Sequence, residues 1–182
     1  MNAIGFLVNT LFDLYLMVVL LRVWLQAARA DFYNPFSQFI VKATQPIIGP
    51  MRRVIPSVGR LDTASIILAL VVVALKYTVL SLMVGAALNI PSILLISVVS
   101  VVKEAGVLLF WMLILRAILS WVSQGKNPIE MVMVQLTEPL LSPIRRIIPP
   151  MGGLDLSLLV LMVILNFVNM LMVQYVPYWA SV

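Results

Sequence analysis

Four long apolar segments dominate this chain and limit what it can fold into. They lie at about residues 4–28, 63–88, 93–122 and 154–176. Each can cross a hydrocarbon core of about 30 Å, which takes roughly 20 helical residues. A helix satisfies its own backbone hydrogen bonds in lipid, and the period-two alternation of a transmembrane barrel is absent from the sequence. We therefore predict an all-α polytopic membrane protein with four transmembrane helices.

Composition excludes several other classes of protein. Hydrophobic residues make up 63% of the chain and charged residues 10%, whereas globular domains average about 45–50% and about 25%. The chain has no cysteine and no histidine, which removes the usual ligands of zinc, iron–sulfur clusters and haem and the commonest acid–base and thiol chemistry. No glycine-rich phosphate loop is present either. We therefore expect no cofactor, no metal and no enzymatic activity.

The continuity of the third segment is left open by the sequence. Lys103 and Glu104 interrupt its apolar run. It is either one long helix over 93–122 or a short interfacial piece followed by a span at 105–122, and we favour the single helix.

Basic residues are distributed unevenly between the connections. The second connection and both termini carry none, whereas the first and third carry eight: Arg29, Lys42, Arg52, Arg53 and Arg60, then Lys126, Arg145 and Arg146. Because basic residues collect in cytoplasmic loops, we predict that both long connections are cytoplasmic and both termini periplasmic.

The chain contains an internal repeat, in which residues 34–68 align with residues 127–161 without a gap. The matches are chemically specific: Asn34 and Pro35 with Asn127 and Pro128, Pro46, Pro50 and Pro56 with Pro139, Pro143 and Pro149, Gly59 with Gly152, and Asp62 with Asp155. We therefore divide the chain into two tandem units, 1–90 and 91–182, each a helix, a connection and a helix. Each unit has an even number of spans, so both share one orientation, and a pseudo-two-fold axis along the membrane normal is the expected packing.

Local signals predict the shape of each connection. Asn34 and Asn127 can cap short amphipathic helices whose first residue is the following proline. Thr44 and Thr137 are placed to cap a second short helix. The prolines listed above should prevent one continuous helix through each connection.

The end of each connection carries a glycine and an aspartate. Gly59 and Gly152 permit a tight turn before the next span. Asp62 and Asp155 are expected to cap that span, and they are also close enough in sequence to pair with the nearby arginines.

Each connection places two adjacent arginines beside an apolar face. Arg52 and Arg145 fall at the edge of that face, while Arg53 and Arg146 point away from it, so the guanidinium groups can reach the phosphate level of the bilayer. One interpretation is a surface that binds anionic lipid headgroups or docks a partner protein. The other is that the arginines only fix topology, since such residues contribute on the order of 1 kcal/mol each.

Ionisable or polar residues at membrane depth are costly unless they find partners. This chain has six candidates: Asp13, Lys76, Lys103, Glu104, Asn166 and Asn169. Asp13 and Lys76 lie at comparable depth, so we predict an ion pair between the first two spans, with a proton or ion path as the alternative. Arg22 and its counterpart Arg116 lie near the end of their spans, where we expect them to snorkel toward the interface.

The doubled pattern resembles the YggT family of bacterial and chloroplast membrane proteins. The pattern is an arginine near the end of one span, then Asn-Pro, then Thr-x-Pro-x-x-x-Pro-x-Arg-Arg-x-Ile-Pro, then Gly-x-Leu-Asp at the next span. The resemblance implies a bacterial inner-membrane protein. The resemblance also implies a broad role: bacterial members of the family are linked to osmotic-stress tolerance, and plastid relatives to cytochrome-complex assembly and nucleoid organisation.

Two functional hypotheses follow from the residues and the resemblance. The first is a non-enzymatic scaffold or assembly factor whose basic connections dock anionic lipid headgroups, other membrane proteins or a second copy. The alternative is a small channel or transport component acting in osmotic adjustment. Direct binding of nucleic acid is not expected, because the basic residues lie beside the spans.

Overall fold

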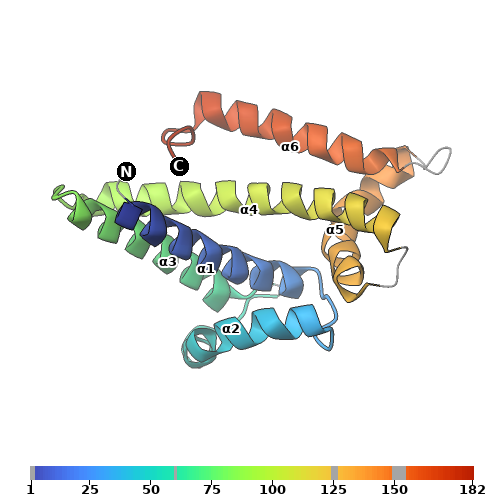
Figure 1. Cartoon of the computed structure of the whole chain (residues 1–182), viewed down its shortest axis with the longest axis horizontal. Coiled ribbons are helices and arrows are strands. Elements are labelled where there is room, and N and C mark those ends of the chain that lie inside the picture. The colour runs from blue at the N-terminus through green and yellow to red at the C-terminus, as the bar shows by residue number, and fades with distance from the viewer. Residues whose placement is uncertain (1–2, 60, 124–126, 149–154) are drawn as a thin grey trace.

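The computed structural model describes residues 3–59, 61–123, 127–148 and 155–182. Within them the chain forms six α-helices and no strand: α1 (Ala3–Ala27), α2 (Pro35–Met51), α3 (Thr63–Met83), α4 (Ile90–Val122), α5 (Pro128–Ile147) and α6 (Leu156–Tyr175) (Figure 1). The predicted all-α class is confirmed.

Four of these helices, α1, α3, α4 and α6, are long and apolar enough to cross a membrane. They coincide with the four predicted spans. α4 is one helix of 33 residues, which confirms the continuous alternative through Lys103 and Glu104. α3 ends at Met83, before the predicted end at 88, because Gly85 takes a φ of +67° and such a left-handed residue stops a helix.

The middle of each unit is one helix where the sequence predicted two. α2 contains Pro46 and Pro50, and α5 contains Pro139 and Pro143. Each proline lacks an N–H for the preceding turn, and its ring bends a helix without necessarily ending it. In Figure 1 the ribbon of α2 turns from lying across the view to being seen end-on. The predicted bend is present, but the predicted break is wrong.

The helix starts follow the predicted caps. Asn34 Oδ1 accepts from the Phe36 N–H at 2.9 Å, and Asn127 Oδ1 accepts from the Ile129 N–H at 2.9 Å. In both units the proline after the asparagine occupies the first turn, where its missing N–H leaves no bond unmade.

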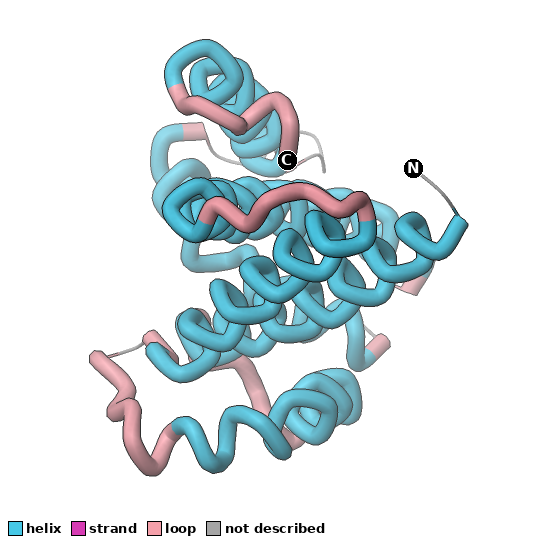
Figure 2. Tube along the Cα trace, turned by 90° about the vertical axis from the view of Figure 1, so that its left-hand side faces the viewer, coloured by secondary structure: helices cyan, strands magenta, loops and turns pink. Residues whose placement is uncertain are grey.

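The spans pack through a single apolar core. α1 and α3 form an antiparallel pair, α4 packs against both, and α6 packs against α4 and α5. In both ribbon views the helices follow one another from α2 through α1 and α3 to α4 and then α6 (Figures 1 and 2). The buried side chains of the first three spans include Leu16, Val19 and Leu20, Leu68, Ala69 and Val72, and Leu109, Met112 and Leu113.

The two connections lie near the same end of the molecule, which we call the basic end: the end at which α1 and α4 finish. α2 packs against α1, α5 packs against α4, and α2 and α5 contact each other. Hydrogen bonds that join the units there run from Asn34 Nδ2 to the Pro128 carbonyl at 2.8 Å, from Trp24 Nε1 to the Leu136 carbonyl at 3.1 Å and from the Asp31 N–H to Gln135 Oε1 at 2.8 Å.

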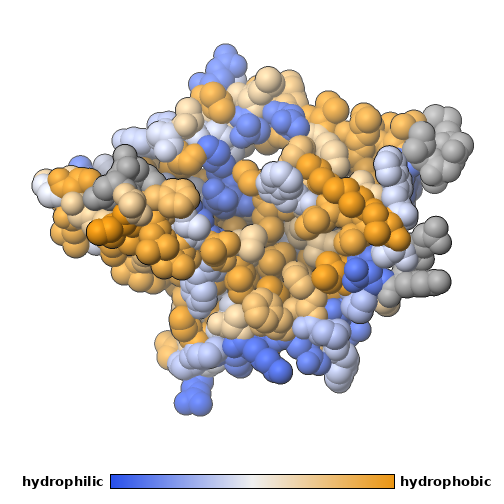
Figure 3. All heavy atoms as spheres, in the orientation of Figure 1, coloured by the Kyte–Doolittle hydropathy of each residue, from blue (hydrophilic) through white to orange (hydrophobic). Residues whose placement is uncertain are grey.

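The outer surface of the spans is apolar. Figure 3 shows hydrophobic side chains over a broad area across the helices, with hydrophilic ones along the lower edge, over α2, and a second hydrophilic group in the upper left part of the view. Large apolar side chains on the outside of the spans include Phe6, Leu11, Leu75, Leu115 and Phe167. Such a surface is stable in lipid and unfavourable in water.

Candidate functional site

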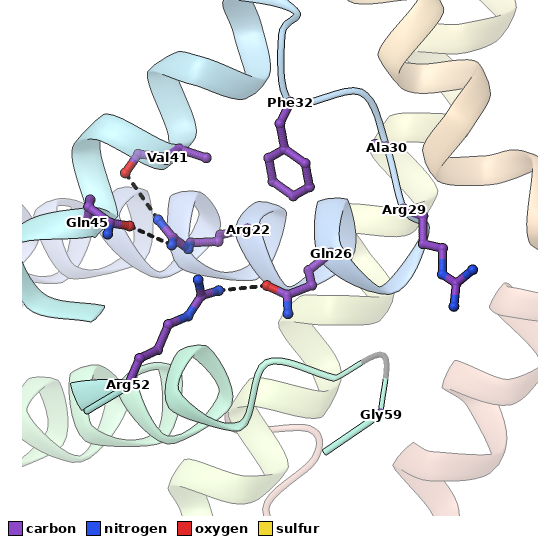
Figure 4. Close-up of a pocket in the computed structure, with 9 residues that line it drawn as sticks. All are labelled: Arg22, Gln26, Arg29, Ala30, Phe32, Val41, Gln45, Arg52 and Gly59. Atoms are coloured by element: carbon purple, nitrogen blue, oxygen red, sulfur yellow. Dashed lines mark hydrogen bonds between the residues drawn. The ribbon is translucent and has the colours of Figure 1, made fainter. Parts of the chain in front are cut away.

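Arg22 of α1 is the centre of a buried polar network at the basic end. The residue is 3% exposed. Its Nη1 donates to the Val41 carbonyl at 3.1 Å, and its Nη2 donates to Gln45 Oε1 at 2.8 Å (Figure 4). Nη1 also donates to Thr44 Oγ1 at 2.7 Å. All three acceptors belong to α2. The bonds therefore fasten the middle of α2 to α1.

Arg52, which follows the last residue of α2, extends this network to the start of α3. Its Nη2 lies 2.5 Å from Asp62 Oδ2, and its Nε donates to Oδ1 at 3.2 Å. The same Nη2 donates to Gln26 Oε1 at 2.6 Å. Asp62 is fully buried, also accepts from the Ser65 hydroxyl, and lies 3.9 Å from Arg22 Nε. α1, the end of α2 and the start of α3 thus meet at one carboxylate.

The second unit builds the same arrangement from matching positions. Arg116 Nη1 donates to Thr137 Oγ1 at 2.6 Å, and its Nη2 donates to Glu138 Oε2 at 3.0 Å. Arg145 Nη1 donates to Glu138 Oε1 at 2.7 Å, and its Nε donates to Asp155 Oδ2 at 3.0 Å. The pattern that repeats in the sequence therefore repeats as a pattern of contacts.

The arginines set the ionisation of the two aspartates. Burial alone would raise the pKa of Asp62, but hydrogen bonds from Arg52 and Ser65 and the charges of both arginines outweigh it and hold that pKa below its usual range. The same balance, with Arg145 as the main donor, lowers the pKa of Asp155. In return the hydrogen bond to Asp155 raises the pKa of Arg145. Both aspartates are therefore carboxylates at neutral pH.

The two networks differ at one matched position in how charge is balanced. The Glu138 carboxylate bridges its two arginines. In the first unit the matched residue is Gln45, which accepts from Arg22 only, while Arg52 turns to Gln26 and Asp62. The first network thus contains two cations and one carboxylate, and the second contains two of each.

The four arginines of the Arg-Arg pairs have two different environments. Arg52 and Arg145 are ion-paired inside the networks. Arg53 and Arg146 are exposed, and neither side chain makes a hydrogen bond or an ion pair with another described residue. The interpretation as a lipid- or partner-binding surface stays a prediction, and its free donors are Arg53 and Arg146.

Two sequence-based expectations in this region are wrong. Arg22 and Arg116 do not snorkel, because each is buried, at 3% and 8% exposure, and bonded to the connection. Thr44 and Thr137 do not cap a helix, because each lies inside one, donates to a carbonyl four residues earlier and accepts from the arginine. A buried charge requires acceptors, and a helix running alongside supplies them.

The turn before α3 forms as predicted. Gly59 has a φ of +60° beside the bridge between Val58 and Leu61, a conformation that other residues rarely adopt. Asp155 caps α6 by accepting from the Ser157 N–H at 3.1 Å. Asp62 precedes α3 without such a bond, because its oxygens are engaged by Arg52 and Ser65. Pro149 and Gly152, the remaining motif positions, lie outside the described residues.

At membrane depth the predicted ion pair between Asp13 and Lys76 is confirmed. Lys76 Nζ lies 2.6 Å from Asp13 Oδ1, and Asn9 Nδ2 donates to the other oxygen at 2.7 Å. Glu104 of α4 interacts electrostatically with both members of the pair. Three spans therefore contribute charge to this cluster.

The other intramembrane polar residues lie elsewhere. Lys103 Nζ donates to the Trp179 carbonyl at 2.9 Å and to that of Val182, and Trp179 Nε1 donates to Asn169 Oδ1 at 2.9 Å. Asn166 donates to the carbonyl one turn earlier in its own helix. In the part of the chain that the structure describes, no group of histidine, cysteine or acidic side chains is arranged to bind a metal ion.

Sequence reasoning missed Gln26, Gln45 and Glu138 as members of the networks. The available signal was the recurrence of Arg22 as Arg116 inside two otherwise apolar spans. Such a residue must find partners, and the polar residue after each repeated threonine is a direct candidate.

Comparison with known proteins agrees with the repeat. The family description CCB3/YggT matches residues 1–83 and 95–176. The chain is 60% identical to "Uncharacterized protein in proC 3'region" of Vibrio alginolyticus, over 98% of each chain. It is 51% identical to "Uncharacterized protein YggT" of Escherichia coli K12, over 93% of this chain and 89% of that one, and 39% identical to an uncharacterized protein of Haemophilus influenzae, over 92% and 90%. No solved structure matches significantly. The chain, with one match to each of its two units, belongs to the CCB3/YggT family.

Proposed function

We propose that this protein is a non-enzymatic scaffold of the bacterial inner membrane. Its two connections face the cytoplasm and present basic side chains to anionic headgroups and to a docked membrane protein, and this docking supports osmotic-stress tolerance. The observation that carries the proposal is the pair of arginine and carboxylate networks. They fix α2 and α5 against the bundle by charge-assisted bonds such as Arg52 to Asp62 and Arg145 to Asp155.

The burial pattern of α2 supports a docking role. Its inward face is closed by Ile40, Thr44 and Ile48, at 1% exposure or less. Its outward face keeps Phe39 at 62% and Ile47 at 45% exposure. Exposed apolar residues beside free arginines are typical of a helix lying in the membrane interface or against a partner.

The alternative, a small transport component, draws on the charged cluster of Asp13, Lys76 and Glu104. Between this cluster and Arg22 the core is apolar, with Leu20, Val72 and other aliphatic side chains buried. A conducting path needs polar groups or water along its length. This observation favours the scaffold.

The test compares variants of the exposed arginines, Arg53 and Arg146, with variants of the ion-paired arginines of the networks. Arg53→Gln with Arg146→Gln should weaken partner co-purification and binding to vesicles containing phosphatidylglycerol, and should reduce stress tolerance in a complemented deletion strain, with membrane abundance unchanged. The loss of vesicle binding expected is about 30-fold, since each of the two arginines contributes about 1 kcal/mol near an anionic surface.

The matched control is Arg52→Gln with Arg145→Gln, which should lower thermal stability because it breaks the networks. An Arg53 and Arg146 variant that inserts normally and keeps full partner binding and stress tolerance would exclude docking. Loss of tolerance on neutralising Asp13, Lys76 or Glu104 alone would instead favour transport.

A further inference from the structure

A cavity of about 600 Å³ opens beside the first network. It lies between the end of α1 and the connection, and Arg22, Arg52 and Arg29 line it together with Gln26, Gln45 and Phe32 (Figure 4). None of its described lining residues is acidic. In Figure 4 the Arg22 and Arg52 side chains point toward one another from α1 and from the end of α2.

The second unit shows what such a pair of arginines binds. There the Glu138 carboxylate lies between the two guanidinium groups, at 3.0 Å and 2.7 Å. In the first unit the matched Gln45 is neutral, so the two guanidinium groups share the Asp62 carboxylate but lack a counterpart of the Glu138 carboxylate. Asp62 compensates one of the two charges from the buried side. The cavity side therefore keeps one positive charge in excess.

A third arginine, Arg29, also lines the cavity. Arg29 follows α1 with a φ of +53°, in the left-handed region that normally selects glycine at a helix end and costs other residues roughly 1–2 kcal/mol. Its side chain is exposed and lines the cavity. Arg29 thus adds a positive charge to the lining, with its guanidinium group directed away from Arg22 and Arg52 in Figure 4.

We propose that this cavity binds a phosphate group, whose oxygens lie between Arg22 and Arg52 as the Glu138 carboxylate lies between its arginines. Guanidinium forks match phosphate and carboxylate oxygens alike. The cavity is far larger than a carboxylate, and it lies beside the end of a membrane span, the level at which lipid phosphates lie. The group is supplied by an anionic headgroup or by a free phosphate compound. The proposal rests on the proposed function in that the site belongs to the first connection.

The central experiment moves the internal anion into the first unit. Gln45→Glu reproduces the residue of the second unit and should close the site by bridging Arg22 and Arg52. The full chain, purified in detergent, is probed with phosphatidylglycerol against phosphatidylcholine by native mass spectrometry. It is also probed with inorganic phosphate against chloride at constant ionic strength, by the shift in Tm.

The wild type should bind at least one probe, and Gln45→Glu should bind it at least about tenfold more weakly, which corresponds to about 1.4 kcal/mol. Retention of phosphatidylglycerol without a response to inorganic phosphate assigns the headgroup, and a phosphate-dependent rise in Tm assigns a free phosphate compound. Equal binding of both probes by wild type and Gln45→Glu would overturn the proposal.

Two further variants keep the result interpretable. Arg29→Gln removes a lining cation whose side chain makes no hydrogen bond or ion pair with another described residue, and it should weaken binding even if Gln45→Glu folds poorly. Arg53→Gln lies outside the lining and should leave probe binding unchanged, while contributing to the docking loss described above. Failure of the phosphate site alone therefore leaves the proposed scaffold role standing, and the reverse also holds.

Discussion

A buried arginine carries five N–H donors that water no longer satisfies. Arg22 obtains its acceptors from Val41, Thr44 and Gln45, and Arg116 obtains them from the matching positions. These bonds explain how a charged side chain is accommodated inside an apolar span. The arginine side chain thus fastens a span to the connection that follows it.

Asp62 makes this arrangement sensitive to acid. Its folded-state pKa lies below the unfolded value of about 3.9. Its contribution to stability is therefore fully present above about pH 4 and is lost as pH falls through the lower, folded-state pKa. The Tm of the purified protein should fall in that acidic range.

Asp62→Asn should flatten this acid dependence and lower the Tm at pH 7, because it leaves two arginines uncompensated at a cost of about 2 kcal/mol or more. Thermal unfolding in detergent from pH 3 to pH 7 measures both effects. Asp31→Asn, at an exposed site of the same charge type, is the control and should follow the wild type. An Asp62→Asn protein with wild-type acid dependence would show that another group controls it.

At the scale of helices, sequence predicted those features that depend on neighbouring residues. The Asn-Pro starts of α2 and α5, the turn at Gly59 and the spans are local consequences of capping, backbone freedom and hydropathy. The break at Thr44 was wrong because proline permits either a bend or an end. The choice was decided by Arg22, which is distant in sequence and bonds to the middle of α2.

The Asp13 and Lys76 pair was predictable because depth in a membrane can be counted along two helices at about 1.5 Å per residue. The contact of Lys103 with Trp179 was not, since it depends on how the chain turns after α6. Glu138 was missed for a similar reason, because its bridge requires the relative placement of α4 and α5.

The Asp13 and Lys76 pair should couple α1 to α3 in stability. Asp13→Asn and Lys76→Met should each lower the Tm, because each leaves one charge unpaired at membrane depth. The double variant should recover much of the loss, with an interaction energy of about 1 kcal/mol or more in a double-mutant cycle. Losses that simply add would show that the two side chains do not stabilise each other.

At the scale of the whole molecule, the repeated sequence produces similar contacts within each unit but unequal surroundings. α3 packs between α1 and α4, whereas α6 packs on α4 and α5. α4 is about 50 Å long at 1.5 Å per residue, longer than the hydrocarbon core, so it tilts or extends beyond it. The duplication therefore provides two matching arginine networks on an asymmetric bundle, and the difference between Gln45 and Glu138 gives them different charge balances.

The orientation of this bundle is the last prediction, and it rests on the eight basic residues in the sequence of the two long connections. The chain has no native cysteine, so single cysteines report cleanly. Ser57→Cys lies in an exposed turn at the basic end, while Ala87→Cys and Ser181→Cys are exposed in the α3–α4 turn and near the final residue. In intact spheroplasts an impermeant thiol reagent should label the latter two, and Ser57→Cys should react only after the membrane is opened. The reverse pattern would place the arginine networks at the periplasmic face, where the positive-inside tendency disfavours them.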